Sequence, residues 1–555
     1  MIRYSVVIPT KARADTLQHV LRNVLSSPRE DIEVIVHQCG RDPATDAVIA
    51  AAADRRLRYH SSADVVPMRE NWERALSHAT GDFVTVIGDD DALVPGAFEV
   101  ADDLIYRHAL SILSWRPVTY YWPGYFDPRL AGRAIYHYDI GAGNVRFASR
   151  YALRCLYRFR WHYSDMPMIY NSFVSRRLID SIRSKQGRYF LLNSPDITSG
   201  AVNALHCEDF VWSNYPLTIT GISPQSTGHR MAMDGSTRAR NEAISEFMPE
   251  RLEQDWIPSV SNLDFSIAAE LLTLRESLDM KDPGLAVAME DIADYVARQL
   301  HKYPQVEESR EALRQFCARH RIDFEGLCAR YRLERLPAAG LPAESSTPDA
   351  CVMNRNLAEL GDADIGSAAR SIASYLGAPR PVATTAVGFE SARLRVSPEP
   401  LQLRFSRTGN APQYLRDGWN PTESFGTWSS RHEATITLPA LEFPGGEGRL
   451  RLEVTGRGPI VSSDMRFFFS VSIAGTRYSR PAEFSALRLS GSEALEVDVA
   501  DLPAGAPLKL IFRGVELVNP ALLRRGEDDR PLGFGLEAVT LTFIPAPVAT
   551  ARPAA

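Results

Sequence analysis

The N-terminal part of the chain alternates short apolar runs with segments in which apolar residues recur every three or four positions. Apolar runs of strand length occupy residues 4–8, 32–36, 57–60 and 83–87. Helical spacing of apolar residues occurs over residues 17–25 and 71–79. Strands and helices that alternate in this way predict a parallel sheet with right-handed crossovers.

The pattern changes after residue 238. Residues 239–336 carry helical spacing, and residues 337–379 contain a Pro-, Ala-, Gly- and Ser-rich linker and one amphipathic helix. From residue 380 to residue 545 the apolar period becomes two, with Gly and Pro turns between short strands, which predicts an antiparallel β-sandwich. Residues 546–555 are rich in Pro and Ala and are predicted to be disordered. The fold prediction is a multidomain α/β plus all-β protein whose α/β domain covers residues 1–238.

Three consecutive acids, Asp89, Asp90 and Asp91, follow the apolar run at residues 83–87. Such a turn lies at the carboxyl edge of the sheet, where open α/β sheets bind ligands. Three neighbouring carboxylates repel one another unless a cation lies among them, and oxygen ligands suit Mg²⁺ or Mn²⁺. A solvated acidic turn that caps the following helix is the alternative interpretation.

The order and spacing of several short motifs resemble the family 2 glycosyltransferases, which have the Rossmann-like GT-A fold. The motifs are residues 7–10, 33–36, 79–82 and 88–91, together with Asn71 and the pair Pro95-Gly96. The resemblance extends to about residue 235 and implies that Asp89, Asp90 and Asp91 bind a Mn²⁺ or Mg²⁺ ion. It also implies a nucleotide-sugar site formed by Pro9, Thr10, Arg13, Gln38, Asn71, Asp89 and Asp90.

The chain departs from the family pattern at the expected nucleobase position. The family usually carries an Asp after the second strand, whereas this chain has His37 and Gln38 there. The Gln38 amide can both donate to and accept from a base edge, and the loop acids Asp42 and Asp64 are alternatives. A second departure is Glu70, which stands where the family often has Arg. The identity of the donor base is therefore left open.

An inverting transferase needs a general base that takes the proton of the acceptor hydroxyl. In the family this base is an acid that precedes a helix, upstream of a last strand with a Pro. Asp196 precedes a helical segment and stands at the right separation from Pro216, so it is the predicted base. Asp209 is the reserve candidate, although it lies too close to Pro216. The alternatives are a helix N-cap for Asp196 and a solvated helix end for Asp209.

Aromatic residues between the acid cluster and Asp196 predict an acceptor cleft, because aromatic rings pack on the apolar faces of sugars. The acceptor candidates are Trp122, Trp161 and Tyr163, with core packing as the alternative for each ring. A polar loop that ends in His229-Arg230 is a candidate to place His229 on the ion.

Two segments of the predicted sandwich resemble paired motifs of a jelly-roll module that accompanies bacterial glycan-synthesis enzymes. They are residues 418–429 and 528–533. The resemblance implies that Trp419 or Trp428 stacks on a glycan. The alternative is that these rings and Arg530 lock a loop onto the sandwich.

Composition narrows the function classes. The formal net charge is −6 and no strongly basic run occurs, which argues against a nucleic-acid partner. The chain opens on a predicted strand and has no apolar run of membrane-spanning length, so neither a secretory signal nor a transmembrane segment is expected. The 6 cysteines lack Cys-x-x-Cys spacing, which argues against zinc and for a reducing compartment. A cytoplasmic enzyme is predicted, with peripheral association at the inner face of the membrane and homo-oligomerisation left open.

These observations predict a metal-dependent inverting glycosyltransferase of the hexosyltransferase type. The donor is a nucleotide-sugar, and the acceptor is a glycan or a lipid- or protein-linked glycan of bacterial surface-polysaccharide biosynthesis. A nucleotidyltransferase is one alternative, although the chain lacks a Gly-rich, Lys- or Arg-bearing phosphate loop after the first strand. The other is a non-catalytic glycan-binding scaffold with a decayed transferase domain, which the missing base-binding Asp keeps open.

Overall fold

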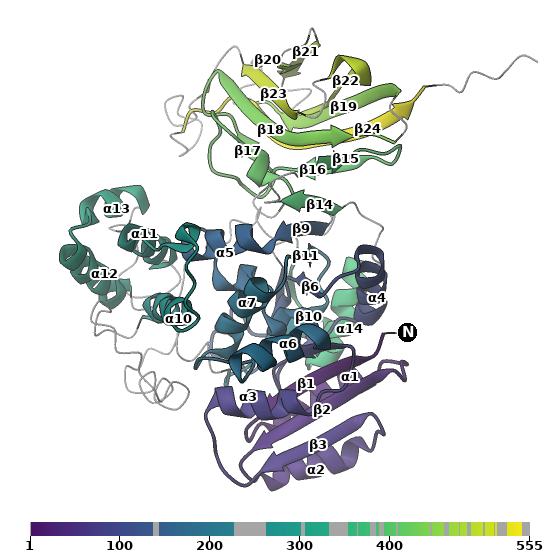
Figure 1. Cartoon of the computed structure of the whole chain (residues 1–555), viewed down its shortest axis with the longest axis vertical. Helices are drawn as coiled ribbons and strands as arrows, with labels where there is room; N and C mark the ends of the chain where they lie inside the picture. Colours follow the sequence, from purple (N-terminus) through teal and green to yellow (C-terminus); the bar gives the residue numbers. More distant parts are fainter. Residues whose placement is uncertain are drawn as a thin grey trace, which may run out of the picture. The chain divides into compact units, whose positions relative to one another are not determined.

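The fold is described by a computed structural model of the chain (Figure 1). It describes residues 2–136, 144–226, 262–300, 306–331, 333, 353–362, 364–377, 384–387, 393–406, 409–444, 447–459, 466–474, 476, 478–485, 490–502, 506–514, 517–518 and 530–546. The chain divides into two compact units. Unit 1 comprises Met1–Tyr136, Phe147–Ser345 and Met353–Arg380, and unit 2 comprises His137–Arg146, Ser346–Val352 and Pro381–Ala555.

A mixed sheet forms the centre of unit 1. Its strands follow the order β11-β6-β10-β4-β1-β2-β3. The bounds are β1 (Tyr4–Thr10), β2 (Ile32–Cys39), β3 (Leu57–Ser62), β4 (Phe83–Val86), β6 (Ile112–Trp115), β10 (Ser172–Ser175) and β11 (Asp209–Ser213). Strand β10 runs antiparallel to β4 and β6, whereas the other neighbours pair in parallel. The parallel arrangement predicted for the first four strands is therefore confirmed.

Helices cover both faces of this sheet, which is why every residue of β1 and β2 is buried. They are α1 (Ala14–Leu25), α2 (Pro43–Ala52), α3 (Met68–Ser77), α4 (Ala97–His108), α5 (Ser149–Tyr157), α6 (Arg176–Gln186) and α7 (Pro195–His206). Successive residues of a strand face opposite ways. Val6 accordingly shares an apolar cluster with Leu17 of α1, whereas Val7 shares another with Trp72 of α3.

A second sheet brings distant segments to the carboxyl edge of the first. Its order is β13-β8-β7-β12-β5. The bounds are β13 (Met353–Asn356), β8 (Arg133–Tyr136), β7 (Val118–Tyr121), β12 (Thr218–Ile222) and β5 (Ala92–Leu93). Strand β5 directly follows the acid cluster and pairs antiparallel with β12. The residues after β12 consequently lie beside the aspartates.

Four more helices of unit 1 lie together, drawn in teal in Figure 1. They are α10 (Leu263–Ser277), α11 (Met289–Gln299), α12 (Val306–His320) and α13 (Phe324–Tyr331). Phe265 and Leu271 of α10 belong to the same apolar cluster as Trp72 and Ile197 of the α/β part. These helices therefore share a core with the sheet. The chain of unit 1 also includes α14 (Ile365–Leu376), and no helix in the described ranges is long and apolar enough to cross a membrane.

Unit 2 contains two sheets that enclose one apolar core, as the period-two pattern predicts. One sheet has the order β15-β18-β23-β20-β21, and the other has the order β16-β24-β19-β22, with β17 paired to β24. The bounds are β15 (Arg393–Arg395), β16 (Leu401–Arg404), β17 (Thr427–Trp428), β18 (Glu433–Glu442), β19 (Gly448–Arg457), β20 (Arg466–Ile473), β21 (Ser479–Ser485), β22 (Ser490–Asp498), β23 (Pro507–Gly514) and β24 (Gly535–Pro545). Leu452, Phe469, Phe512 and Leu541 are among the buried residues between the sheets. The predicted antiparallel pairing is confirmed except for β15 and β18, which pair in parallel, while the jelly-roll topology stays a prediction.

Candidate functional site

Asp91 fastens the acid loop to the neighbouring strand. All three aspartates are buried, with exposed fractions of 4%, 5% and 2% for Asp89, Asp90 and Asp91. The backbone N–H groups of Gly88 and Gly221 donate to the two carboxylate oxygens of Asp91, at 2.6 and 2.9 Å. Both oxygens of Asp91 are thus occupied by the backbone, and this residue joins the loop after β4 to β12.

Asp90 is held by the loop that follows β12. The hydroxyls of Ser223 and Ser226 donate to its Oδ2 at 2.7 and 2.6 Å. The indole N–H of Trp122 donates to the carbonyl oxygen of Asp90 at 3.0 Å. A Cβ on Gly221 would lie 1.7 Å from that carbonyl oxygen, so only glycine permits this close approach.

Arg13 compensates part of the negative charge of the cluster. Its guanidinium lies 3.1 Å from Asp89 and 4.0 Å from Asp90, and it donates to the carbonyl oxygen of Gln225 at 2.6 Å. Burial disfavours the charged guanidinium, but the charges of Asp89 and Asp90 outweigh this effect and raise the pKa of Arg13. The Thr10 hydroxyl donates to the other oxygen of Asp89 at 2.6 Å.

The cluster still holds more negative charge than one arginine can balance. Burial raises the pKa of Asp89, and burial together with the charge of Asp90 raises the pKa of Asp91 to about 7. The described residues nevertheless include no group of three His, Cys, Asp or Glu side chains that could hold a metal ion. The three carboxylates face different partners, and their joint ligation of one ion stays a prediction.

The predicted donor residues gather at the edge formed by β1 and β2. In the strand register Pro9 lies opposite His37, and Thr10 lies opposite Gln38. Asn71 of α3 bonds His37 Nδ1 through its Oδ1 at 2.7 Å and donates to the Thr10 carbonyl at 3.5 Å. Burial lowers the pKa of His37, which favours the neutral imidazole in this contact.

Gln38 has an unsatisfied acceptor. The side chain is 1% exposed and its amide N–H donates to the Cys39 carbonyl at 3.1 Å. Its Oε1 is buried and finds no hydrogen-bond partner among the described residues. Asp42, an alternative at the nucleobase position, instead caps α2 by accepting from Thr45. Among the residues considered for the nucleobase position, Gln38 thus has a buried acceptor, Oε1, that a ligand could bond.

Asp196 lies in the first turn of α7, where Ser194 is the N-cap residue. The N-cap interpretation of Asp196 is therefore wrong. Burial raises the pKa of Asp196. Burial raises the pKa values of Tyr163 and Tyr170, and the charge of Asp196 acts in the same direction on both.

Tyr170 connects Asp196 to the acid cluster. This residue of a short 3₁₀ helix (Ile169–Asn171) hydrogen-bonds Asp91 through its hydroxyl. Burial and then the charges of Asp91, Asp90 and Asp196 raise its pKa. The same 3₁₀ helix contacts α7, because the backbone N–H of Ile169 donates to the Ser199 hydroxyl at 3.4 Å. Sequence reasoning missed Tyr170, since nothing local distinguishes it from a core tyrosine.

Glu270 is a second carboxyl beside Asp196 that sequence reasoning missed. It is 1% exposed on α10, and Ser194 donates to its Oε1 at 3.3 Å, while Oε2 has no partner among the described residues. Burial raises the pKa of Glu270 to about 7, and the charge of Asp196 acts in the same direction. A lone acid inside an apolar helical run was the available signal.

Asp209 is the first residue of β11, so it lies at the amino ends of the parallel strands and not at their carboxyl ends, where the acid cluster lies. Val211 pairs with Leu113, which sets Asp209 level with Ser111. Ser111 accepts from Ser175, and Ser175 pairs with Phe83 at the start of β4. The acid cluster follows the other end of β4, so the structure does not bring the reserve candidate to the site.

The three acceptor candidates have different surroundings. Tyr163 belongs to a short 3₁₀ helix (Tyr163–Asp165) that packs on α7, the helix of Asp196. Trp122 is 8% exposed and supports the acid loop through its bond to Asp90. Trp161 packs edge-on against Phe147, with ring centroids 4.9 Å apart. For Trp122 and Trp161 the packing alternative describes the observed contacts. His229 lies outside the described residues.

In unit 2 both predicted tryptophans pack edge-on against a phenylalanine, and their glycan-binding role stays a prediction. Trp419 donates to the Thr435 carbonyl at 2.8 Å and packs edge-on against Phe512. Trp428 of β17 packs edge-on against Phe425 with ring centroids 5.3 Å apart. Arg530 donates to Glu423 at 2.7 Å, which is the loop-locking contact foreseen as the alternative.

Comparison with known proteins identifies the domain that carries the acid cluster. Residues 5–166 match the family model for Glycosyl transferase family 2. The N-terminal part of this chain is a family 2 glycosyltransferase domain. Its mixed sheet is GT-A-like, as the motifs implied.

Individual relatives match the transferase domain at low identity. The GalNAc(5)-diNAcBac-PP-undecaprenol beta-1,3-glucosyltransferase of Campylobacter jejuni is 29% identical over 100 residues, which are 18% of this chain and 32% of that protein. The chain thus spans about a third of the length of this curated relative. S. aureus TarS 1–349 in complex with UDP-GlcNAc is 16% identical, covers 60% of this chain and 92% of its own, and has a TM-score of 0.35. A mannosyltransferase from Pyrobaculum calidifontis in complex with GDP-Man and Mn²⁺ is 14% identical, covers 60% and 84%, and has a TM-score of 0.30.

Proposed function

We propose that this protein is a metal-dependent inverting glycosyltransferase that transfers a hexose-type sugar from a nucleotide-sugar to a glycan or glycoconjugate. The observation that carries the proposal is the connected set of contacts from the acid loop, where Tyr170 hydrogen-bonds Asp91, to α7, where the backbone N–H of Ile169 donates to the Ser199 hydroxyl at 3.4 Å. A donor at the acid loop and an acceptor hydroxyl at Asp196 would occupy the two ends of this set. The matched relative is named for an undecaprenol-linked substrate, which favours a lipid-linked glycan acceptor at the inner face of a bacterial membrane.

The donor nucleotide is assigned to the edge of β1 and β2. The orphan Oε1 of Gln38 would accept a hydrogen bond from a base N–H, which replaces the carboxylate that the family usually has there. Asn71 and Thr10 complete this edge through their mutual contact. This arrangement supports nucleotide binding without choosing between a purine and a pyrimidine.

Asp90, with Asp89 beside it, is the residue that best fits a divalent ion. Both oxygens of Asp91 accept backbone N–H groups, whereas Oδ1 of Asp90 has no hydrogen bond from the described residues. Mg²⁺-type sites use one or two carboxylates and complete their shell with water and substrate phosphates. When bound, such an ion neutralises the charge that develops on the diphosphate leaving group.

Asp196 is assigned as the general base. The acceptor hydroxyl oxygen attacks the anomeric carbon, its proton passes to the Asp196 carboxylate, and the bond from that carbon to the diphosphate oxygen breaks with inversion. Burial makes this carboxylate more basic than an exposed Asp. Tyr163 and Glu270 beside it are assigned to positioning the acceptor.

The test is a thermal-shift screen of the full chain against UDP-, GDP-, dTDP- and CMP-linked sugars, with and without Mn²⁺. A ligand that binds the folded state alone raises the melting temperature by mass action. A metal-dependent increase with one donor class, followed by release of that nucleoside diphosphate when a glycan acceptor is added, supports the proposal. Stability unchanged by every nucleotide would favour the glycan-binding scaffold.

Glu270 should make the stability of the protein fall as the pH rises. Its pKa is about 7 in the folded protein, above the ordinary value of 4.5 that applies to the unfolded chain, so the folded protein holds a proton that the unfolded chain has released. Raising the pH from about 5 to about 8 therefore lowers the free energy of unfolding. Glu270→Gln keeps the neutral shape and should flatten this decline, which melting temperatures across that range would measure.

The matched control is Glu276→Gln, which changes an exposed carboxyl on the same helix. It should leave the pH dependence of the melting temperature as in the wild type. Equal slopes for Glu270→Gln and the wild type would contradict the assignment of Glu270 as a buried group that is protonated near neutral pH.

A further inference from the structure

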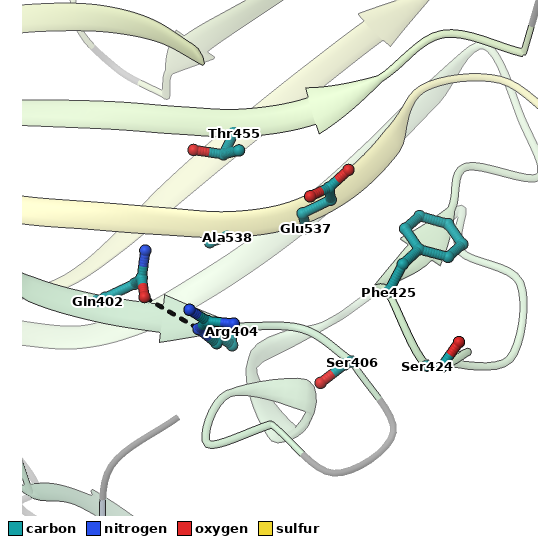
Figure 2. Close-up of a pocket in the computed structure, with 8 residues that line it drawn as sticks. All are labelled: Gln402, Arg404, Ser406, Ser424, Phe425, Thr455, Glu537 and Ala538. Atoms are coloured by element: carbon teal, nitrogen blue, oxygen red, sulfur yellow. Dashed lines mark hydrogen bonds between the residues drawn. The ribbon is translucent and has the colours of Figure 1, made fainter. Parts of the chain in front are cut away.

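Unit 2 contains a cavity of about 240 Å³ that belongs to neither the transferase site nor the tryptophans singled out from the sequence. Figure 2 shows side chains of strands β16, β19 and β24 and of the loop before β17 around it. The lining residues are Gln402, Arg404, Ser406, Ser424, Phe425, Thr455, Glu537 and Ala538. The cavity is smaller than the roughly 300–1,000 Å³ of pockets for drug-sized ligands, so its size suits a single ring.

Donors and acceptors are mixed on the walls of this cavity. The guanidinium of Arg404 donates to the amide oxygen of Gln402 at 2.9 Å (Figure 2). Glu537 accepts a hydrogen bond from Arg457 at 2.7 Å. The charge of Glu537 is thus paired, and the site has no cluster of positive charge that would select a phosphate. Neutral, hydroxyl-rich ligands match this set of groups.

Ser406 supplies an unsatisfied group. The residue is 3% exposed, and its hydroxyl is buried without a hydrogen-bond partner among the described residues. A buried hydroxyl that makes no hydrogen bond costs free energy, since it has lost its bonds to water. A ligand hydroxyl in the cavity would supply the missing bond.

Phe425 gives the cavity one apolar wall in a fixed position. The guanidinium of Arg457 lies 4.2 Å from the centre of its ring, and Trp428 packs against its edge. The next residue, Gly426, lies so close to β24 that an added Cβ would be 1.9 Å from the Leu536 carbonyl oxygen. The loop is therefore pinned to the sheet, and the ring is preorganised for contact with a ligand.

We propose that this cavity is a saccharide-binding site for one neutral hexose or N-acetylhexosamine residue of a glycan. A sugar ring presents hydroxyls around its edge and apolar C–H groups on its faces, which match the polar walls and Phe425. The proposal that the sugar binds here stands by itself. That the bound glycan is the acceptor rests on the proposed function.

The test is saturation-transfer difference NMR on the full chain with glucose, N-acetylglucosamine and N-acetylgalactosamine at millimolar concentration. We expect the wild type to bind at least one of them. Phe425→Ala should weaken that binding by about tenfold or more, because it removes the apolar wall. The matched control is Phe468→Ala, an exposed phenylalanine on β20 of the same unit, which should bind as the wild type does.

Ser406→Ala provides a second readout that does not depend on the folding of the Phe425 variant. It should weaken binding by about threefold to tenfold while leaving the melting temperature unchanged or higher, because the hydroxyl it removes makes no bond in the free protein. Absence of binding by all three sugars, or equal binding by wild type and both variants, would overturn the proposal. Donor-induced thermal shifts should persist in both variants, so failure of this site and failure of the transferase assignment are distinguishable.

Discussion

Asp196→Asn should lower the rate of sugar transfer by about 10²–10⁴-fold while leaving donor binding intact. Asparagine has nearly the same shape as aspartate but cannot accept the proton of the acceptor hydroxyl. Asp196 is half-buried in the first turn of α7, and burial raises the pKa of its carboxyl. The measurement is release of nucleoside diphosphate in the presence of acceptor, with the donor-induced thermal shift as the second readout.

Asp209→Asn is the matched control for this prediction. Asp209 lies level with the start of β4, at the sheet edge opposite the acid cluster. Its variant should therefore retain transfer within a few fold of the wild type. A result in which Asp209→Asn abolishes transfer and Asp196→Asn does not would reassign the base and contradict the placement of the acceptor at α7.

The sequence predicted those features that depend on neighbouring residues. An apolar run that ends in three aspartates places them at the end of β4, and the structure has them there. The same holds for the period-two strands of unit 2, whose alternate residues fill one core. Thr10 and Asn71 were singled out by the resemblance to family 2 glycosyltransferases, and the structure brings them into contact.

Contacts between distant segments could not be predicted in this way. Ser194 and Glu270 are 76 residues apart in the chain and meet only because α10 shares the core of the sheet. Trp122 is an aromatic residue of the kind that packs on sugar rings, yet its indole N–H donates to the carbonyl oxygen of Asp90. Hydrogen-bond partners of this kind depend on the tertiary packing of the strands, which periodicity does not encode.

The acid cluster is the clearest case in which the sequence could not predict contacts. Its three consecutive aspartates are identical in the sequence but have three different environments. Asp89 faces Thr10 and Arg13, whereas Asp90 faces two serine hydroxyls. Asp91 accepts two backbone N–H groups from segments more than a hundred residues apart. Three identical side chains in the sequence thus have three different sets of hydrogen-bond partners in the fold.

Asp90→Asn should abolish the metal-dependent part of the donor-induced thermal shift while leaving the melting temperature of the free protein close to that of the wild type. The serine hydroxyls that face Asp90 can bond an amide oxygen as well as a carboxylate, so the fold tolerates the change. The loss of charge removes the carboxylate assigned to the ion. The measurement is the melting temperature with the donor, with and without Mn²⁺.

Asp91→Asn supplies the contrast, because its amide has only one oxygen to accept the two backbone N–H groups of Gly88 and Gly221. One buried donor is then left unsatisfied, which should lower the free energy of unfolding by about 1–3 kcal/mol without ligand. If Asp91→Asn instead kept its stability and lost the metal-dependent shift, while Asp90→Asn retained that shift, Asp91 would be the ligand. The two substitutions are at neighbouring positions, but Asp90→Asn should change the metal response and Asp91→Asn should change the stability. This difference follows from the hydrogen-bond partners of each carboxylate in the fold.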